Sequence, residues 1–285
     1  MRKCALLSIA NTNGWFIDDD LVHEPLKALG WEVENVPWDE AVHWNAFDVV
    51  VIRSPWDYQD HLKRFVEVLE AINQSRARLV NSLDTVKWNI DKCYLFELEQ
   101  KGIEIVPTIQ HDALNESKIE MASRGFDSNE LVVKPTIGAN ADDTFRINVK
   151  DSGSMKQPIS IFKDRVCLVQ PFMPGIVQEG EFSLMYFNGR LSHTILKTAK
   201  EGDYRIQEEH GGGVIAIKSP EKGLISVGDR VMNTLNKSPL YARVDLVRTA
   251  NNSFALMELE LIEPCLYFRF DPDSPEAFAK CIDDL

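Results

Sequence analysis

The chain has 285 residues, of which 44% are hydrophobic and 26% charged, and this length suits two or three compact lobes rather than one core. Its formal net charge of −13 at pH 7 argues against nucleic-acid backbone as a partner, because such binding needs a basic surface. No run approaches the roughly 20 apolar residues that cross a bilayer, and scattered cysteines behind a leader-free N-terminus predict a cytoplasmic protein without a membrane partner.

The first part of the chain alternates strand and helix patterns. The strand patterns cover residues 4–10, 31–36, 47–52 and 79–80, and the helix patterns cover 18–29 and 60–74. The third strand run is continuous and β-branched, which is typical of a parallel strand covered on both faces. An open α/β layer is therefore expected over residues 1–85.

A mixed loop, Arg53-Ser-Pro-Trp-Asp-Tyr58, directly follows the third strand. Ligands of open α/β sheets gather at this end of the strands. A cation, an aromatic ring and a carboxylate in one loop favour substrate recognition, through Arg53, Ser54, Trp56 and Asp57. The alternative is a packed turn in which Trp56 fills a gap and Arg53 pairs with Asp57.

From about residue 81 the pattern changes to short strands separated by loops. A polar segment at 81–92 leads into a helix that ends near Gly102, and part of another helix is expected at 228–235. The strand patterns cover 103–108, 131–135, 166–171, 181–187 and 191–197. Asn188-Gly189 between the last two is a strong hairpin signal. This half is predicted to be α+β, with antiparallel sheet.

Near the C-terminus, two apolar strand-like runs flank Asn251-Asn252, and Asn tolerates the positive φ of a tight turn. If this pair is the turn, Asp245 faces Glu258 and Arg243 faces Glu260, all on one side of the hairpin. Like charges directly opposite each other destabilise a hairpin, so these carboxylates call for a cation. Clustered hard oxygen ligands suit Mg²⁺. The alternative is a strand pair whose charges are solvated.

Two lysines, Lys134 and Lys197, end apolar runs. A lysine that projects from a sheet into a cleft supplies a point charge for a phosphate oxygen, whereas an edge-strand lysine blocks aggregation. The small-residue loop at 136–146 can lie over a polyphosphate, although the chain has no GxxxxGK[ST] motif. Three glycines at 211–213, close after Arg205, suggest a backbone that approaches a ligand, with a mobile surface loop as the alternative.

The order of these motifs resembles the ATP-grasp superfamily over nearly the whole chain. Within it, the sequence is most similar to the glutathione-synthetase-like branch, which includes cyclo-ligases of the cycloserine-forming type. The motifs that carry the closer similarity are Arg53-Ser-Pro-Trp-Asp57, Lys134-Pro135 with Asp143-Thr144, and Arg243-Val-Asp245. The resemblance implies an N-terminal open α/β domain (1–85) followed by two α+β lobes, 86–170 and 171–285, that clasp ATP.

The resemblance also implies which residues bind the nucleotide. Lys92 and Lys134 are expected at the phosphates, and Lys197 near adenine or phosphate. Glu181, or with less support Glu179, is expected at the ribose. The backbone that reads the adenine edge is expected from four consecutive residues, Gln170, Pro171, Phe172 and Met173.

The metal and catalytic residues follow from the same resemblance. Two Mg²⁺ ions are expected at Asp245, Glu258 and Glu260. The family usually has Glu-x-Asn at the last ligand pair, whereas this chain has Glu258-Leu-Glu260, so Glu260 and the nearby Glu263 can exchange roles. Arg205 is expected to stabilise the transferred phosphoryl group. The remaining predicted catalytic residues are Lys134 and Arg243, and the predicted substrate carboxylate ligands are Arg53, Arg205 and Arg243.

The reaction that the family implies has two steps, on small-molecule carboxylate and amine substrates. A substrate carboxylate attacks the γ-phosphate of ATP to give an acyl-phosphate, and a nitrogen nucleophile then expels phosphate. The enzyme's task is positioning and charge neutralisation, which requires no side-chain nucleophile. Three alternatives are a cyclo-ligase with one organic substrate, a small-molecule kinase on the same scaffold, and a non-catalytic nucleotide-binding module.

Overall fold

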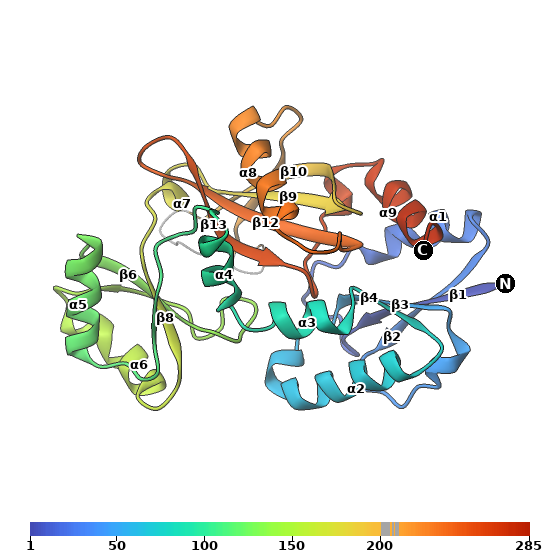
Figure 1. Ribbon diagram of the computed structural model, residues 1–285, viewed down its shortest axis with the longest axis horizontal. Coiled ribbons are helices and arrows are strands. Elements are labelled where there is room, and N and C mark those ends of the chain that lie inside the picture. Colours follow the sequence, from blue (N-terminus) through green and yellow to red (C-terminus); the bar gives the residue numbers. More distant parts are fainter. Residues whose placement is uncertain (201–205, 207, 209–210) are drawn as a thin grey trace.

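The computed structural model describes residues 1–200, 206, 208 and 211–285. In this part of the chain the strands form three sheets, which Figure 1 shows as three adjoining lobes. The strand orders are β2-β1-β3-β4, β5-β8-β6-β7 and β11-β10-β9-β12-β13. The mixture of a parallel sheet with two antiparallel sheets confirms the predicted combination of α/β and α+β structure.

The N-terminal sheet is parallel throughout. Its strands are β1 (Arg2–Ser8), β2 (Trp31–Pro37), β3 (Val49–Ser54) and β4 (Arg78–Val80). Every residue of β3 is buried, as its continuous apolar run predicts. The connecting helices are η1 (Asp19–Val22), α1 (His23–Ala28), η2 (Trp44–Ala46), η3 (Tyr58–His61) and α2 (Leu62–Gln74).

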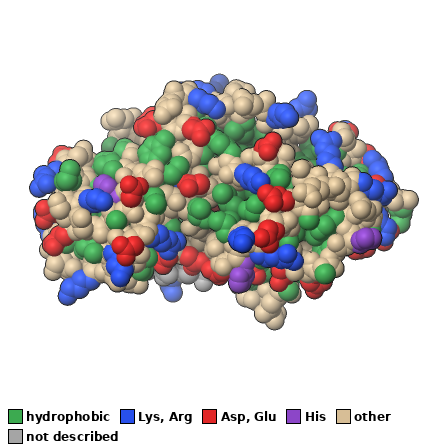
Figure 2. Space-filling view, turned by 60° about the horizontal axis from the view of Figure 1, so that its bottom comes forward, with side chains coloured by type: hydrophobic (Ala, Val, Ile, Leu, Met, Phe, Trp, Pro, Cys, Tyr) green, Lys and Arg blue, Asp and Glu red, His purple; other side chains and the backbone are tan. Residues whose placement is uncertain are grey.

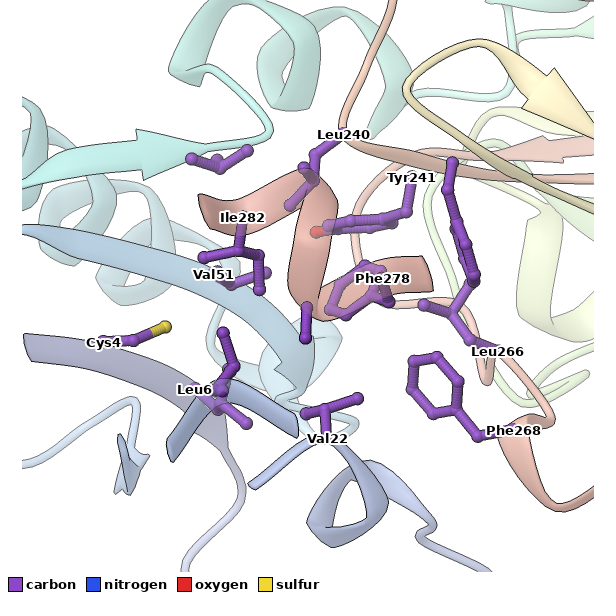
Figure 3. Close-up of a cluster of buried hydrophobic side chains, with 14 of the residues drawn as sticks. Cys4, Leu6, Val22, Val51, Leu240, Tyr241, Leu266, Phe268, Phe278 and Ile282 are labelled. Atoms are coloured by element: carbon purple, nitrogen blue, oxygen red, sulfur yellow. The ribbon is translucent and has the colours of Figure 1, made fainter. Parts of the chain in front are cut away.

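Both faces of this sheet are covered by apolar side chains. On one face Ala5, Leu7 and Ile52 pack against α2. On the other face Leu6 and Val51 join a cluster to which the last helix, α9 (Ser274–Asp283), contributes Phe278 and Ile282. Figure 3 shows this second cluster, in which α9 lies over β1 and β3. The C-terminal helix is therefore part of the N-terminal core.

The middle sheet is antiparallel and follows two short helices, α3 (Leu83–Asn89) and α4 (Tyr94–Gln100). Its strands are β5 (Ile109–His111), β6 (Glu130–Pro135), β7 (Phe145–Asn148) and β8 (Cys167–Pro171). Its helices are α5 (Glu116–Phe126) and α6 (Ser152–Phe162).

The predicted strand at 103–108 is wrong. Only Ile105 forms a bridge, to Leu256, and β5 begins at Ile109 instead. The Val106 amide donates to the Leu256 carbonyl at 2.9 Å, but the next residue is Pro107. The Leu256 amide in turn donates to the Glu104 carbonyl at 2.8 Å, and the pairing does not continue beyond this bridge.

The C-terminal sheet is antiparallel along its whole width. Asn188 and Gly189, between its first two strands, have φ of 46° and 77°, which is the geometry predicted for this hairpin turn. The strands are β9 (Glu181–Phe187), β10 (Arg190–Thr198), β11 (Gly213–Ala216), β12 (Tyr241–Arg248) and β13 (Phe254–Glu260). The helices of this part are α7 (Gly175–Gln178), α8 (Lys222–Asn233) and η5 (Phe268–Phe270).

The β12–β13 hairpin has the predicted register at its functional end. Asp245 pairs with Glu258, and Arg243 pairs with Glu260. The predicted two-residue turn is wrong, because Arg248 pairs with Phe254 and the loop spans the residues between them. A register shift after Asp245 leaves one extra residue on β13, and this bulge restores the predicted pairing.

The surface carries mixed charges. Acidic and basic side chains are interspersed over the face in Figure 2, so the net charge of −13 is not gathered into a single patch there. Of the helices that the structure describes, none is both long and apolar enough to cross a membrane.

Candidate functional site

A cavity of about 270 Å³ lies where the three sheets meet. Side chains from β6, β8, β9, β10, β12 and β13 line it, together with aromatic side chains from the N-terminal domain. Most of the predicted site residues are in this lining: Trp56, Lys92, Lys134, Gln170, Pro171, Phe172, Met173, Glu181, Lys197, Arg243, Asp245, Glu258, Glu260 and Glu263. Residues scattered over more than 200 positions of sequence are thus brought to one place.

In the C-terminal sheet, strand alternation places one lysine, two carboxylates and a serine on the same face. Lys197 of β10 pairs across the strands with Glu181 of β9, and Asp245 of β12 pairs with Ser183 of β9. Because side chains two residues apart share a face, all four point the same way. The Lys197 Nζ atom lies 2.5 Å from Glu181 Oε1 and 3.5 Å from Asp245 Oδ1.

Asp245 is the most enclosed carboxylate of the site, with 2% of its surface exposed. Ser183 Oγ donates to its Oδ1 at 2.5 Å. Arg243 Nε donates to the same oxygen at 3.0 Å, and Arg243 Nη2 donates to Oδ2 at 2.9 Å. Burial alone would raise the pKa of Asp245, but Arg243 and Lys197 outweigh burial and hold that pKa below its ordinary value. This carboxylate is therefore ionised at neutral pH.

Two lysines, Lys92 and Lys134, lie near the Glu258 carboxylate. Lys92 Nζ lies 2.9 Å from Glu258 Oε1 and donates to the Gly138 carbonyl at 2.7 Å. Burial would lower the pKa of Lys92, but Glu258 outweighs it and the pKa rises. For Lys134 burial is the stronger effect and lowers the pKa, although Glu258 opposes the shift. The Gly138 contact ties Lys92 to the small-residue loop after β6.

The last two carboxylates of the cavity have raised pKa values. Burial raises the pKa of Glu260 to about 8, against the attraction of Arg243, whose Nη2 contacts it. Burial likewise raises the pKa of Glu263 to about 7, against Lys92 and a hydrogen bond with Tyr58. A cationic partner would therefore stabilise the ionised form of both carboxylates at neutral pH.

The predicted adenine-binding stretch is the end of β8 and the residues that follow it. Gln170 is buried, and its side-chain amide donates to Thr108 Oγ1 at 2.8 Å. The Phe172 amide donates to the Glu130 carbonyl at 2.9 Å, and the Met173 carbonyl accepts from Ile176. These two backbone groups have partners within the protein, and the stretch itself lines the cavity.

The predicted recognition loop is arranged differently from either expectation. Arg53 has 1% of its surface exposed and lies outside the cavity lining, because β3 continues to Ser54 and both residues are interior. The Arg53 Nε atom donates to Asp19 Oδ1 at 3.0 Å, so the expected pair with Asp57 is wrong. Asp57 instead accepts from the Trp38 indole at 2.6 Å. Of the four residues of this segment that were assigned to substrate, only Trp56 lines the cavity, together with its unassigned neighbour Tyr58.

Two further predicted site residues, Glu179 and Arg205, are not among the described residues that line the cavity. Glu179 lies outside the cavity lining and forms an ion pair with Arg248, with Nε and Oε2 2.7 Å apart. Gly180, with φ of 128°, turns the chain between Glu179 and Glu181, so only Glu181 faces the cavity. Arg205 lies outside the residues that the structure describes.

Some residues of the site were not predicted from the sequence. Ser183 could have been found, because it lies two positions after Glu181 on the same strand and so shares its face. No sequence pattern marked Asn89 as part of the site. Its side-chain amide donates to the Leu259 carbonyl and its Oδ1 accepts from the Leu261 amide, both at 2.8 Å. It thereby fixes the end of β13 beside Glu258 and Glu260.

The carboxylates have the chemistry of a divalent-metal site but are paired with cations in this arrangement. Within the described residues, no group of three or more His, Cys, Asp or Glu side chains stands close enough to hold a metal ion. Arg243 lies between Asp245 and Glu260, and Lys92 holds Glu258. The donors are hard carboxylate oxygens on one face of a hairpin, which is the ligand type that suits Mg²⁺.

Two sequence comparisons find similarity to proteins of cycloserine biosynthesis. The model for the N-terminal domain of D-cycloserine synthetase DcsG matches residues 4–81. Over 282 aligned residues the chain is 28% identical to the cycloserine biosynthesis protein DcsG of Streptomyces lavendulae, covering 91% of this chain and 90% of that protein.

Solved structures extend the agreement to the whole fold. The crystal structure of D-cycloserine synthetase DcsG superimposes with a TM-score of 0.87 at 25% identity, covering 99% of each chain. A RimK domain ATP-grasp protein from Sphaerobacter thermophilus gives a TM-score of 0.71 at 16% identity, covering 99% of this chain and 98% of that one.

Proposed function

We propose that this chain, an ATP-grasp protein similar to D-cycloserine synthetase and an ATP-dependent ligase, activates the carboxylate of a small amino-acid-like substrate as an acyl-phosphate. A nitrogen nucleophile then replaces the phosphate. The observation that carries the proposal is the composition of the cavity, which combines three lysines with a carboxylate-bearing hairpin. Such a set neutralises phosphate charge and positions a transferring phosphoryl group.

The nucleotide is proposed to lie between the middle and C-terminal sheets. The stretch from Gln170 to Met173 is assigned to adenine and Glu181 to the ribose, since both line the cavity. Lys92 and Lys134 are assigned to the phosphates, and Lys197 completes the cationic side. The buried ammonium groups suit phosphate oxygens as point charges.

The metal ligands are proposed to be Asp245, Glu258 and Glu260, holding two Mg²⁺ ions. Glu260 is preferred over Glu263 as the third ligand, because Glu260 shares one face of β13 with Glu258 while Glu263 lies beyond the strand. When bound, Mg²⁺ would supply positive charge beside these carboxylates and so offset the negative charge of a phosphate group.

The proposed reaction follows from these placements. A substrate carboxylate oxygen attacks the γ-phosphorus of ATP, and the bond to the ADP oxygen breaks. Lys134 and Arg243 stabilise the charge that develops on the phosphoryl oxygens, and Arg205 is assigned the same role. The nitrogen lone pair then attacks the acyl carbon, the nitrogen loses a proton, and inorganic phosphate leaves.

A second candidate is an intramolecular reaction, in which the carboxylate and the nitrogen nucleophile belong to one substrate and a ring closes. The similarity to D-cycloserine synthetase over nearly the full length of both chains favours it. Mass spectrometry of the product separates the two reactions, because ring closure consumes a single organic substrate.

The proposal is tested by ADP release with small carboxylic acids, alone and with amines, in the presence of Mg²⁺. Hydroxylamine in the same assay converts an acyl-phosphate into a hydroxamate. We expect ADP and hydroxamate to appear together for the acids that are accepted. A phosphorylated product that resists hydroxylamine would indicate a kinase and contradict the proposal, as would the absence of ADP across the panel.

A further inference from the structure

Tyr267 lines the cavity with its backbone in the left-handed region, at φ of 52°. This conformation costs free energy for any residue with a Cβ, and it persists only where the surrounding structure fixes it. Outliers of this kind cluster at active sites and ligand-binding positions. The backbone of Tyr267 thus makes its side chain a candidate for a direct role in the site.

The residues on either side of Tyr267 fix its position. Leu266 and Phe268 are both buried, and Figure 3 shows them in the core that includes Phe278. The Leu266 carbonyl lies 2.8 Å from His193 Nε2, and the ring centroid of Phe268 lies 5.3 Å from that of Phe278. Tyr267 is therefore held at the cavity by its neighbours in the chain, without a contribution from a bound ligand.

The hydroxyl of Tyr267 is available as a hydrogen-bond donor. Among the described residues it has no hydrogen-bond partner, and it is not one of the fully enclosed polar atoms, so a ligand in the cavity can reach it. Burial raises the pKa of Tyr267, so the hydroxyl is protonated at neutral pH. Lys197 and Arg243 oppose this shift in the pKa, which places both cations near the hydroxyl.

The charged groups nearby indicate which oxygen of a ligand this hydroxyl suits. Lys92 and Lys134, the lysines assigned to the phosphates, have Glu258 as their strongest charged partner, whereas Arg243 is among the groups that act on Tyr267. Arg243 is assigned to the transferring phosphoryl group, which becomes bonded to the substrate carboxyl group. The phosphoryl oxygens carry the most charge and have these cations as partners, so a neutral donor beside Arg243 suits the carbonyl oxygen of the acyl-phosphate.

We propose that Tyr267 is a catalytic residue of the second step, in which its hydroxyl donates a hydrogen bond to the carbonyl oxygen of the acyl-phosphate. As the nitrogen lone pair forms a bond to the acyl carbon, the π electrons of the C=O bond move to this oxygen, and negative charge develops there. The C=O bond forms again as the bond to the phosphate oxygen breaks, and the departing phosphate takes up the proton that the nitrogen loses. A donor to this oxygen lowers the barrier to acyl transfer and has little effect on the phosphoryl transfer before it. The inference rests on the proposed ligase function and adds a residue to its mechanism.

The test separates the two steps by rapid mixing of the enzyme, loaded with ATP and Mg²⁺, with a carboxylic acid. The acids of the ADP-release panel serve as probes, both enantiomers of alanine and serine among them, and ammonia is the nucleophile. ADP formed in the first turnover without ammonia measures acyl-phosphate formation, and amide formed with ammonia, detected by mass spectrometry, measures acyl transfer. Tyr267→Phe should form the first ADP at a rate within about threefold of wild type and form amide about 100-fold more slowly, as when one oxyanion donor is lost.

Tyr186→Phe is the matched control. Its hydroxyl donates to Asp229 at 3.0 Å outside the cavity lining, so both rates should stay within about twofold of wild type. Removal of the Tyr267 hydroxyl breaks no hydrogen bond within the described part of the chain, so the urea midpoint of Tyr267→Phe should match that of wild type. Its affinity for ATP with Mg²⁺ should also match, because the phosphates are assigned to Lys92 and Lys134.

Three results would overturn the inference. Amide formation by Tyr267→Phe within about threefold of wild type would show that the hydroxyl does not assist acyl transfer. Equal losses in both steps would assign Tyr267 to the structure where the urea midpoint also falls, and to phosphoryl transfer where it does not. These two results leave the ligase function intact, whereas absence of ADP from the wild type with every acid would overturn the ligase function and this inference together.

Discussion

Buried carboxylates in this protein are kept ionised or neutral by their immediate partners. Asp245 has Arg243 and Lys197, and its pKa is held down, whereas Glu260 is raised to about 8 by burial that Arg243 only partly offsets. Carboxylates on one hairpin face therefore have different pKa values because their neighbours differ. We therefore expect substitutions at the individual carboxylates to have different effects on activity.

Glu258→Gln should abolish ATP turnover without unfolding the protein. The substitution removes the charge that holds Lys92 at 2.9 Å and is proposed to bind Mg²⁺, while the amide oxygen still accepts from Lys92. We expect ADP release below about 1% of the wild-type rate, as when a transition-state charge partner is lost. Circular dichroism should show an unchanged spectrum. Wild-type-like turnover would contradict the metal assignment.

Glu179→Gln is the matched control. Its carboxylate pairs with Arg248 outside the cavity lining, so ADP release should stay within about twofold of wild type. A loss comparable to that of Glu258→Gln would return Glu179 to the nucleotide site, as one reading of the sequence allowed.

His193 should make stability depend on pH. Its Nε2 lies 2.8 Å from the Leu266 carbonyl, which can only accept, so Nε2 carries the proton and Nδ1 accepts from Ser192. Burial lowers the pKa of His193 below its ordinary 6.5. Below pH 6.5 the His193 side chain is therefore protonated in the unfolded chain but still neutral in the folded protein. Because the unfolded state binds the additional proton, the free energy of unfolding falls as pH drops from about 6.5 through the lowered pKa.

Urea unfolding of wild type and His193→Gln measures this effect. The wild type should be the more stable of the two at pH 7.5, and its advantage should shrink as the pH falls to 5.5. An advantage that stays constant or grows over this range would show that His193 does not titrate on unfolding.

At the scale of elements, the sequence predicts features that depend on neighbouring residues, but it does not predict pairing between distant segments. Asn188-Gly189 requires only a local turn, and it was predicted correctly. The run at 103–108 has strand character, but it pairs only through one bridge, between Ile105 and Leu256, a partner about 150 residues away. Arg53 was assigned to a loop because nothing local showed that Asp19 and Pro264 would enclose it.

Gly180→Ala should destabilise the junction between α7 and β9. Gly180 has φ of 128°, and an added Cβ would lie 2.4 Å from the Lys197 carbonyl oxygen. Neither backbone can give way without disturbing the Glu181–Lys197 pair, so we expect a loss of about 3 kcal/mol in the free energy of unfolding and a higher KM for ATP.

Gly30→Ala separates steric contact from backbone strain. Gly30 also has positive φ, 84°, but nothing lies within 4 Å of its added Cβ. Its loss should be about 1 kcal/mol, with KM unchanged. Equal losses in the two variants would show that the contact with Lys197 has no effect.

On the scale of the whole molecule, the site depends on three sheets that meet at one cavity. The candidate residues could be predicted because ionisable side chains at strand positions are conspicuous in sequence, and the family resemblance supplied their roles. Their partners could not be predicted, because Arg53 with Pro264 and Asn89 with Leu259 are far apart in the chain. The position of the backbone at Glu263 and Pro264, beside the cavity, depends on such contacts.

Phe278→Ala should destabilise the molecule well beyond α9. The ring is fully buried against Tyr241, Phe187 and Phe268, within the core shared by the N-terminal and C-terminal sheets. We expect a loss of about 3–5 kcal/mol in the free energy of unfolding. Phe126→Ala, at a partly buried position on α5, should cost about half as much. A smaller loss for Phe278→Ala than for Phe126→Ala would contradict the shared core.

The position of α9 over β1 and β3 also bears on how the protein is made. A ribosome releases the N-terminal sheet first, and the helix that covers Leu6 and Val51 follows about 200 residues later. One apolar face of that sheet therefore stays without this cover until α9 emerges. The core of the first domain is completed only when α9 has been synthesised.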